Sequence, residues 1–187
     1  MLSSIDTALF HFINGGLKGP FLDYLMPMFL RYSDWSLIVA LSLLILIYRD
    51  WRSGAYFILL LILAVALTDG ITYRLVKPFF GRIRPCNVIP LGTFNLMAGC
   101  SDSFSFPSQH AANMFAVAAV VANRYKKAAT FAIAVASMVA ISRVYVGVHY
   151  PIDVAGGAII GYLLGLSVIK ISRRFNQKNN ESRVDGD

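Results

Sequence analysis

Residues 54–76 read GAYFILLLILAVALTDGITYRLV, an apolar run that only four polar or charged side chains interrupt, all near its end. A helix needs about 20 largely apolar residues to cross roughly 30 Å of hydrocarbon. The runs 128–148 and 152–171 also meet that requirement. The shorter runs 35–48 and 111–125 can span where flanking residues reach the interface or the bilayer thins. We therefore predict an all-α, polytopic membrane helix bundle with about five spanning helices, or six if the N-terminal region also crosses.

The composition agrees with a membrane protein. Of 187 residues, 57% are hydrophobic, 14% are charged and only two are cysteine. An ordinary soluble domain carries about 25% charged residues. This balance excludes a soluble enzyme, a disordered protein and a disulfide-dense secreted scaffold.

The basic residues predict how the bundle is oriented. They produce a net charge of +7. Many of them follow the first, third and fifth predicted spans: Arg49, Arg52, Arg124, Lys126, Lys127, Lys170, Arg173, Arg174, Lys178 and Arg183. Segments that follow the first, third and fifth spans emerge on the same side of the membrane. Short loops rich in basic residues mark the cytoplasmic side. We therefore expect a multi-pass protein of the inner membrane, with a cytoplasmic C-terminus and the segment 77–108 outside, facing the periplasm. Because the basic residues flank apolar helices, no nucleic-acid partner is expected.

The remaining segments complete a single integral-membrane domain, residues 1–174. Segment 2–31 holds two stretches too short to span, which we predict to be interfacial amphipathic helices; one tilted, broken span is the alternative. Residues 175–187 are polar and predict a disordered cytoplasmic tail. Glycine recurs every four residues in the last span, at Gly157, Gly161 and Gly165. This close-packing stripe favours packing within one chain, so a monomer is expected.

Polar and ionisable residues, whose placement near hydrocarbon is energetically unfavourable, gather at one end of the predicted bundle, where three predicted helix junctions meet. They are Lys77, Arg84, Ser108, His110, Arg143, His149 and Asp153. Each alone has a plain explanation, such as a snorkelling cation or a helix cap, but together they indicate a site in the outer segment 77–108. Three converging cations suit a phosphate dianion. Ser108 after Pro107 predicts a helix start whose free N–H groups can hold anionic oxygens.

Two residues have the spacing of a nucleophile and its orienting partner. Pro151 suits the first turn of the last helix, so His149 precedes that turn and Asp153 lies within it. A carboxylate so placed can fix the imidazole tautomer and leave the other ring nitrogen free to attack. His110 comes from a different predicted helix and is free to act as a general acid.

Four further residues of the outer half have less definite roles. Cys86 and Cys100 can form one bridge on an oxidising face, closing a loop of about 15 residues worth roughly 3 kcal/mol. Two inert thiols are the alternative. Arg82 is interpreted as a solvated or headgroup-contacting cation, and Asp69 as a structural group that could pair with a cationic neighbour on a packed face.

The polar residues form three motifs, KPFFGRIRP at 77–85, PSQH at 107–110 and SRVYVGVHYPID at 142–153. These motifs resemble the signatures K-x6-R-P, P-S-G-H and S-R-x5-H-x3-D of the type 2 phosphatidic acid phosphatase (PAP2) superfamily of integral-membrane lipid phosphatases. The resemblance implies hydrolysis of a phosphomonoester or pyrophosphate through a phosphohistidine, with no metal and no other cofactor. It implies that His149 is the nucleophile, Asp153 its orienting partner and His110 the acid. The implied phosphate-binding residues are Lys77, Arg84, Ser108 and Arg143.

Gln109 departs from the resemblance, because the family usually has glycine at this position. Its amide could donate to a phosphate oxygen, so we include it among the predicted phosphate-binding residues. The leading hypothesis is a lipid phosphate phosphatase of the outer interface, whose partners are membrane lipids and a lipid phosphate or diphosphate. Candidate substrates are undecaprenyl diphosphate, phosphatidylglycerol phosphate, phosphatidate and the 1-phosphate of lipid A. The alternatives are a non-enzymatic lipid-headgroup transporter or flippase, and an oxyanion enzyme similar to the vanadium haloperoxidases.

Overall fold

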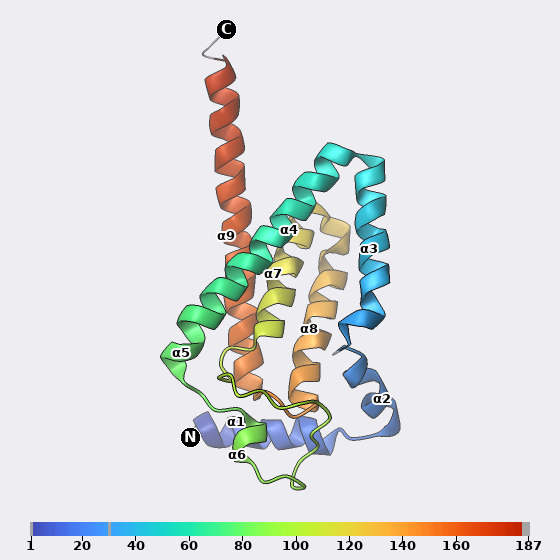
Figure 1. Ribbon diagram of the computed structural model, residues 1–187, viewed down its shortest axis with the longest axis vertical. Helices are drawn as coiled ribbons and strands as arrows, with labels where there is room; N and C mark the ends of the chain where they lie inside the picture. Colours follow the sequence, from blue (N-terminus) through green and yellow to red (C-terminus); the bar gives the residue numbers. More distant parts are fainter. Residues whose placement is uncertain (1, 30, 185–187) are drawn as a thin grey trace.

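The computed structural model describes residues 2–29 and 31–184, and every regular element within them is a helix. In chain order they are α1 (Leu2–His11), η1 (Phe12–Gly16), α2 (Pro20–Met28), α3 (Tyr32–Arg49), α4 (Trp51–Ile71), η2 (Thr72–Val76), α5 (Lys77–Phe80), α6 (Pro85–Val88), α7 (Gln109–Arg124), η3 (Lys126–Ala128), α8 (Ala129–Tyr145) and α9 (Pro151–Val184). Figure 1 shows α3, α4, α7, α8 and α9 as a bundle, with α1 lying across one end. The predicted all-α bundle is confirmed.

Helix α7 lies inside the bundle, where it contacts α4, α8 and α9 (Figure 1). Its inward side chains are small, and several are almost fully buried: Ala111, Ala112, Ala116, Ala118 and Ala119. A helix enclosed by other helices needs small residues for close approach rather than bulky residues that face lipid. This enclosure explains why α7 has a weaker apolar signal in the sequence than its neighbours.

Glycines of α9 bring two backbones into direct contact. A Cβ atom added to Gly161 would lie 1.9 Å from the carbonyl oxygen of Ala112 on α7. Added Cβ atoms at Gly157 and Gly165 would lie 2.5 and 2.7 Å from backbone oxygens of α7 or its N-cap residue. No side chain fits in these positions. The predicted close-packing stripe therefore forms a glycine seam, made by these three residues, between α9 and α7.

Three helical stretches are long and apolar enough to cross a membrane, as judged by length and composition. They are Trp51–Val88, Lys126–Tyr145 and Pro151–Gln177, and a shorter apolar helix covers Trp35–Arg49. These stretches include α4, α8, α9 and most of α3. The spanning role of α3 and of the enclosed helix α7, and with it the number of five spans, stays a prediction.

The N-terminal segment is helical, as the sequence predicts, and α1 has an unusual distribution of side chains. Its apolar residues Ile5 and Leu9 are 55% and 46% exposed, and Phe12, the first residue of η1, is 60% exposed. Asp6 and Phe10 point inward and are buried. This arrangement, with apolar groups outside and a carboxylate inside, is what a helix resting on hydrocarbon requires. Its place at the membrane interface stays a prediction.

Helix α9 extends beyond the predicted end of the domain. It runs to Val184, through most of the segment 175–187 that the sequence predicts to be a disordered tail. The segment contains no proline, and its only glycine is Gly186, so nothing in its sequence breaks the helix earlier. Figure 1 shows this end of α9 projecting beyond the bundle. Residues 185–187 lie outside the described residues.

Candidate active site

The chain between α4 and α6 supplies two cations that line the pocket described below, Lys77 and Arg84. Helix α4 continues through η2 into α5, which places Lys77 at the end of the long helix. Lys77 is 3% exposed, and its Nζ donates to the carbonyl oxygen of Phe104. Gly81 has a φ of 56° and turns the chain back in a left-handed conformation that suits glycine. Arg84 then donates from Nε and Nη2 to the carbonyl oxygen and Oγ of Ser103, both at 2.9 Å.

The start of α7 supplies the second set of site residues, Ser108 and His110. Ser108 is the N-cap residue of α7, and its backbone N–H donates to the carbonyl oxygen of Asp153 over 2.9 Å. This bond ties the start of α7 to the start of α9. The Oγ atom of Ser108 is buried and has no hydrogen-bond partner among the described residues. His110 follows in the first turn of the helix.

The end of α8 and the turn that follows it supply the third set of site residues, Arg143 and His149. Arg143, near the end of α8, is 5% exposed, and its Nη2 donates to the carbonyl oxygen of Phe29 over 3.2 Å. Gly147 has a φ of 87°, and a Cβ atom there would lie 2.7 Å from the carbonyl oxygen of Asn95. The turn therefore requires glycine for both conformation and space. It brings His149 to the junction with α9.

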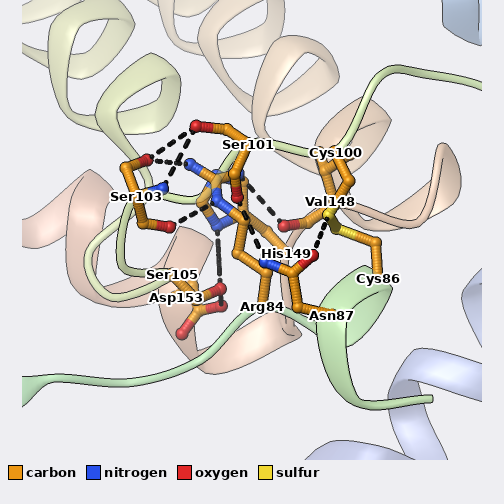
Figure 2. The surroundings of a disulfide bond; sticks show 10 residues. All are labelled: Arg84, Cys86, Asn87, Cys100, Ser101, Ser103, Ser105, Val148, His149 and Asp153. Atoms are coloured by element: carbon orange, nitrogen blue, oxygen red, sulfur yellow. Dashed lines mark hydrogen bonds and ion pairs between the residues drawn. A yellow bond between two sulfur atoms is a disulfide. The ribbon is translucent and has the colours of Figure 1, made fainter.

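The imidazole of His149 lies between a carboxylate and a guanidinium (Figure 2). Its Nδ1 is 3.5 Å from Oδ2 of Asp153, and its Nε2 is 3.2 Å from Nη1 of Arg84. Burial lowers the pKa of His149 to about 4, and the positive charges of Arg84 and Lys77 act in the same direction, against the opposing effect of Asp153. The ring is therefore neutral at pH 7, as a nitrogen nucleophile requires.

The carboxylate of Asp153 is held from several sides. Its Oδ2 accepts hydrogen bonds from Ser105 Oγ and, over 2.8 Å, from the backbone N–H of Tyr150. Its Oδ1 accepts from Nη1 of Arg82 over 2.8 Å. The side chain has no exposed surface. Because the carboxylate is fixed, it can orient the imidazole beside it.

A pocket opens in front of His149. Its lining residues are Tyr73, Lys77, Arg84, Ala98, Gly99, Ser101, Ser103, Gln109, His110, Arg143, Val148 and His149. The structure thus brings six of the eight predicted site residues onto one surface. The other two, Ser108 and Asp153, are both fully buried, and Asp153 lies against the imidazole of His149. Three cations and two imidazoles that line one pocket can bind and transfer a phosphoryl group.

Gln109 lines the pocket, but its amide is already hydrogen-bonded to residues of α4 and η2. Its Nε2 donates to Oδ1 of Asp69, and its Oε1 accepts from Thr72 Oγ1 over 2.8 Å. Asn113 donates to the same Asp69 oxygen over 2.8 Å. The structure therefore gives Gln109 a role in joining α7 to α4, which differs from the predicted donation to phosphate. Asp69 therefore accepts hydrogen bonds from two amides of α7, but its side chain is exposed, which differs from the predicted place on a packed face beside a cation.

A disulfide joins Cys86 to Cys100 beside the pocket, with 6.0 Å between their Cα atoms (Figure 2). Asn87, next to the first cysteine, donates from Nδ2 to the carbonyl oxygen of Ser101 over 3.2 Å. These contacts tie the segment that carries Ser101 and Ser103 to the segment that carries Arg84.

Three residues of the site escaped the sequence analysis. Arg82 is not a solvated cation, because it forms ion pairs with both Asp153 and Asp6. Ser105 lies 3.3 Å from Nδ1 of His149 and donates to Asp153. No motif spacing points to Asp6 or Ser105. The proximity of Arg82 to the predicted cations was the one available signal.

Comparisons with known proteins agree with this geometry. A family model described as the PAP2 superfamily matches residues 54–177. The lipid A 4'-phosphatase of Bacteroides thetaiotaomicron is 33% identical over 166 residues, which cover 86% of this chain and 73% of that protein. Phosphatidylglycerophosphatase B of Bacillus subtilis is 35% identical over 156 residues, covering 76% and 70%. The crystal structure of Aquifex aeolicus LpxE superposes with a TM-score of 0.68 at 29% identity, covering 89% of this chain and 95% of that one.

Proposed function

Because the chain belongs to the PAP2 superfamily and is a membrane lipid phosphatase, a hydrolase of phosphoric esters, we propose that it cleaves a lipid phosphate or diphosphate through a phosphohistidine at His149. One observation carries this proposal. The imidazole of His149 has Asp153 on one ring nitrogen and Arg84 on the other, at the wall of a pocket that also holds Lys77 and His110. A headgroup-binding site needs the cations but has no use for an oriented, neutral imidazole.

In the first step, Nε2 of His149 attacks phosphorus and the bond from phosphorus to the lipid oxygen breaks. Nη1 of Arg84 is 3.2 Å from Nε2, so it is within reach of an oxygen on a phosphoryl group bonded there. Lys77 and Arg143 line the same pocket and neutralise the remaining oxygens. Burial and the neighbouring positive charges lower the pKa of His110 to about 3, so His110 must take up a proton as the phosphate dianion enters the pocket. It then gives this proton to the leaving lipid oxygen, and Asp153 stabilises the positive charge that develops on the ring of His149.

In the second step, water attacks the phosphohistidine. His110, now deprotonated, takes a proton from that water, and the bond between phosphorus and Nε2 breaks. The products are inorganic phosphate and the regenerated imidazole when a phosphomonoester is the substrate. Phosphoryl transfer demands positioning and charge stabilisation above all. The cationic side chains of this pocket supply both, and we propose that no metal ion is required.

We also propose that the site faces the outside of the inner membrane. The turns that join α3 to α4 and α7 to α8 carry basic residues, and Figure 1 shows them at the end of the bundle opposite the site. Basic turns favour the cytoplasm. The disulfide between Cys86 and Cys100 supports an oxidising environment on the side of the pocket. The C-terminus is then cytoplasmic.

The substrate class follows from similarity. The relatives are named for lipid A 4'-phosphate and for phosphatidylglycerophosphate. We propose a substrate of that chemistry, a phosphomonoester or diphosphate headgroup on a membrane lipid. Phosphate release across a panel of such lipids, in matched detergent, identifies the preferred one.

The test uses purified protein, a lipid phosphate and excess chelator. His149→Ala should abolish phosphate release, and an alkaline quench of the wild-type reaction should trap a phosphohistidine that the variant lacks. His11→Ala is the matched control, because His11 is an exposed histidine of α1 far from the pocket residues in sequence and absent from their lining. Undiminished activity in His149→Ala would overturn the mechanism, and full dependence on added divalent metal would overturn metal independence.

A further inference from the structure

A buried carboxylate lies near the N-terminus of the chain, on the first helix. Asp6 on α1 has a side chain with no exposed surface. Buried charges need partners, because burial in a medium of low dielectric constant penalises the ionised form. Asp6 has two partners. Its Oδ1 accepts from the backbone N–H of Ile152 over 2.9 Å, and its Oδ2 accepts from Nη2 of Arg82.

Arg82 connects this carboxylate to the catalytic pair. Its other terminal nitrogen, Nη1, lies 2.8 Å from Oδ1 of Asp153. Its guanidinium also lies over the ring of Tyr150, 4.3 Å from the ring centroid, a distance typical of a cation–π contact. A planar guanidinium with one nitrogen on each carboxylate has little freedom to rotate. The chain of contacts therefore runs from Asp6 through Arg82 and Asp153 to His149.

We propose that Asp6 is a positioning residue for the hydrolysis, acting through Arg82 on the carboxylate that orients His149. This inference rests on the proposed function, because it presumes that His149 is the nucleophile. Asp6 touches no pocket surface and no reacting atom, so it is not a catalytic residue. It makes the N-terminal helix part of the active-site assembly.

Two physical effects support this role. The first is geometric: Asp6 holds Ile152 in the first turn of α9, the turn that carries Asp153, and it fixes the plane of the Arg82 guanidinium. The second is electrostatic. Arg82 shares its charge between two carboxylates, so without Asp6 the whole charge falls on Asp153. Asp153 would then stabilise positive charge on His149 less well, and that charge develops only in the reaction.

The expected kinetic signature follows from this placement. Asp6→Asn keeps the shape and an acceptor for Ile152 but removes the charge. We expect kcat to fall on the order of 10-fold, the loss typical when an outer-shell carboxylate partner is removed. KM should change less than about 2-fold, because ground-state binding rests on residues that Asp6 does not contact.

A double-mutant cycle tests the route through Arg82. Arg82→Gln should lower kcat, and adding Asp6→Asn in that background should lower it little further, since residues that act as a unit are not additive. Asn14→Ala is the matched control. Asn14 is also buried in the N-terminal segment, and its side chain bonds to the carbonyl oxygens of Tyr145 and Asn95, away from Asp153. It should affect stability without lowering kcat.

Each outcome decides the proposal. An unchanged kcat in Asp6→Asn, or an equal loss of kcat in Asn14→Ala, overturns it, and so do fully additive losses in the double mutant. Thermal unfolding in detergent shows whether Asp6→Asn folds. If it does not fold, the test uses Arg82→Gln, and an unchanged kcat in that variant also overturns the proposal. Failure of the proposed function is distinguishable, because only in that case does His149→Ala remain active.

Discussion

Replacement of Gly161 by alanine should disable the enzyme at a distance from its pocket. A Cβ atom at this position would lie 1.9 Å from the carbonyl oxygen of Ala112, and real Cβ atoms essentially never approach a heavy atom closer than 3.0 Å. The backbones of α9 and α7 must therefore separate by about 1 Å. Neither contact atom is the end of a flexible side chain, so the helices themselves have to move.

The size of the effect follows from where the seam lies. Ala112 is two residues after His110, and Gly161 is two turns after Asp153 on the same helix. A shift of about 1 Å in the position of a catalytic group can cost roughly 100-fold in rate. Overpacking of this kind also costs about 1–3 kcal/mol of stability. We expect Gly161→Ala to lower kcat/KM by about 100-fold and to lower the unfolding temperature.

The assay is phosphate release from a lipid phosphate in detergent, together with thermal unfolding of the same preparation. Gly70→Ala is the matched control, because Gly70 lies within α4 and an added Cβ would meet no atom within 4 Å. Alanine there should keep full activity and should stabilise the helix by about 0.5–1 kcal/mol. A folded Gly161→Ala protein with wild-type kcat/KM would refute the argument that the seam sets the distance between the two catalytic helices.

Four further outcomes are expected. Replacing Cys86 and Cys100 by serine should cost about 3 kcal/mol of unfolding free energy, from the closure of a loop with a sequence separation of 14, and equal denaturation midpoints with and without the bridge would contradict this. Activity should persist as the pH falls from 7 and be lost only near pH 4, because burial lowers the pKa of His149 to about 4 and only the neutral ring attacks; half-loss near pH 6.5 would argue for an exposed nucleophile. Between pH 7 and pH 4 the imidazole of His149 binds a proton in the unfolded protein, where its pKa is near 6.5, before it does so in the folded protein, where its pKa is about 4. The free energy of unfolding should therefore decrease as the pH falls. Gln109→Gly should keep measurable activity, because the amide serves the contact with Asp69; complete loss of phosphate release would show that its amide acts on the substrate.

Much of the site was predictable because its residues follow local rules. His149 and Asp153 are separated by one helical turn, and proline between them predicts where that turn begins. Lys77 and Arg84 stand at the end of a long apolar run. Such signals depend only on neighbours in sequence. The structure brings Lys77, Arg84 and His149 together at one pocket, with Asp153 against the imidazole.

The residues that escaped prediction depend on long-range packing. Asp6 meets Arg82 and Ile152 only because α1 crosses the end of the bundle, and its own segment reads as an ordinary amphipathic helix (Figure 1). Ser105 reaches Asp153 from a segment without regular structure, where no periodicity marks a side chain. The sequence predicts too early an end for α9. A polar segment without helix breakers can be helical or disordered, and hydropathy does not distinguish these two states.

The bond between Asp6 and Ile152 has a consequence for the order in which the protein is made. Its two residues lie 146 positions apart, so the ribosome synthesises α1 first and the start of α9 almost last. Until α9 is inserted, the carboxylate of Asp6 lacks the backbone partner that α9 supplies, and Arg82 lacks Asp153. Completion of the site therefore coincides with completion of the fold. A nascent chain that stalls before its last helix holds His149 without Asp153, so its imidazole has no orienting carboxylate, and we expect that it cannot act on the lipids around it.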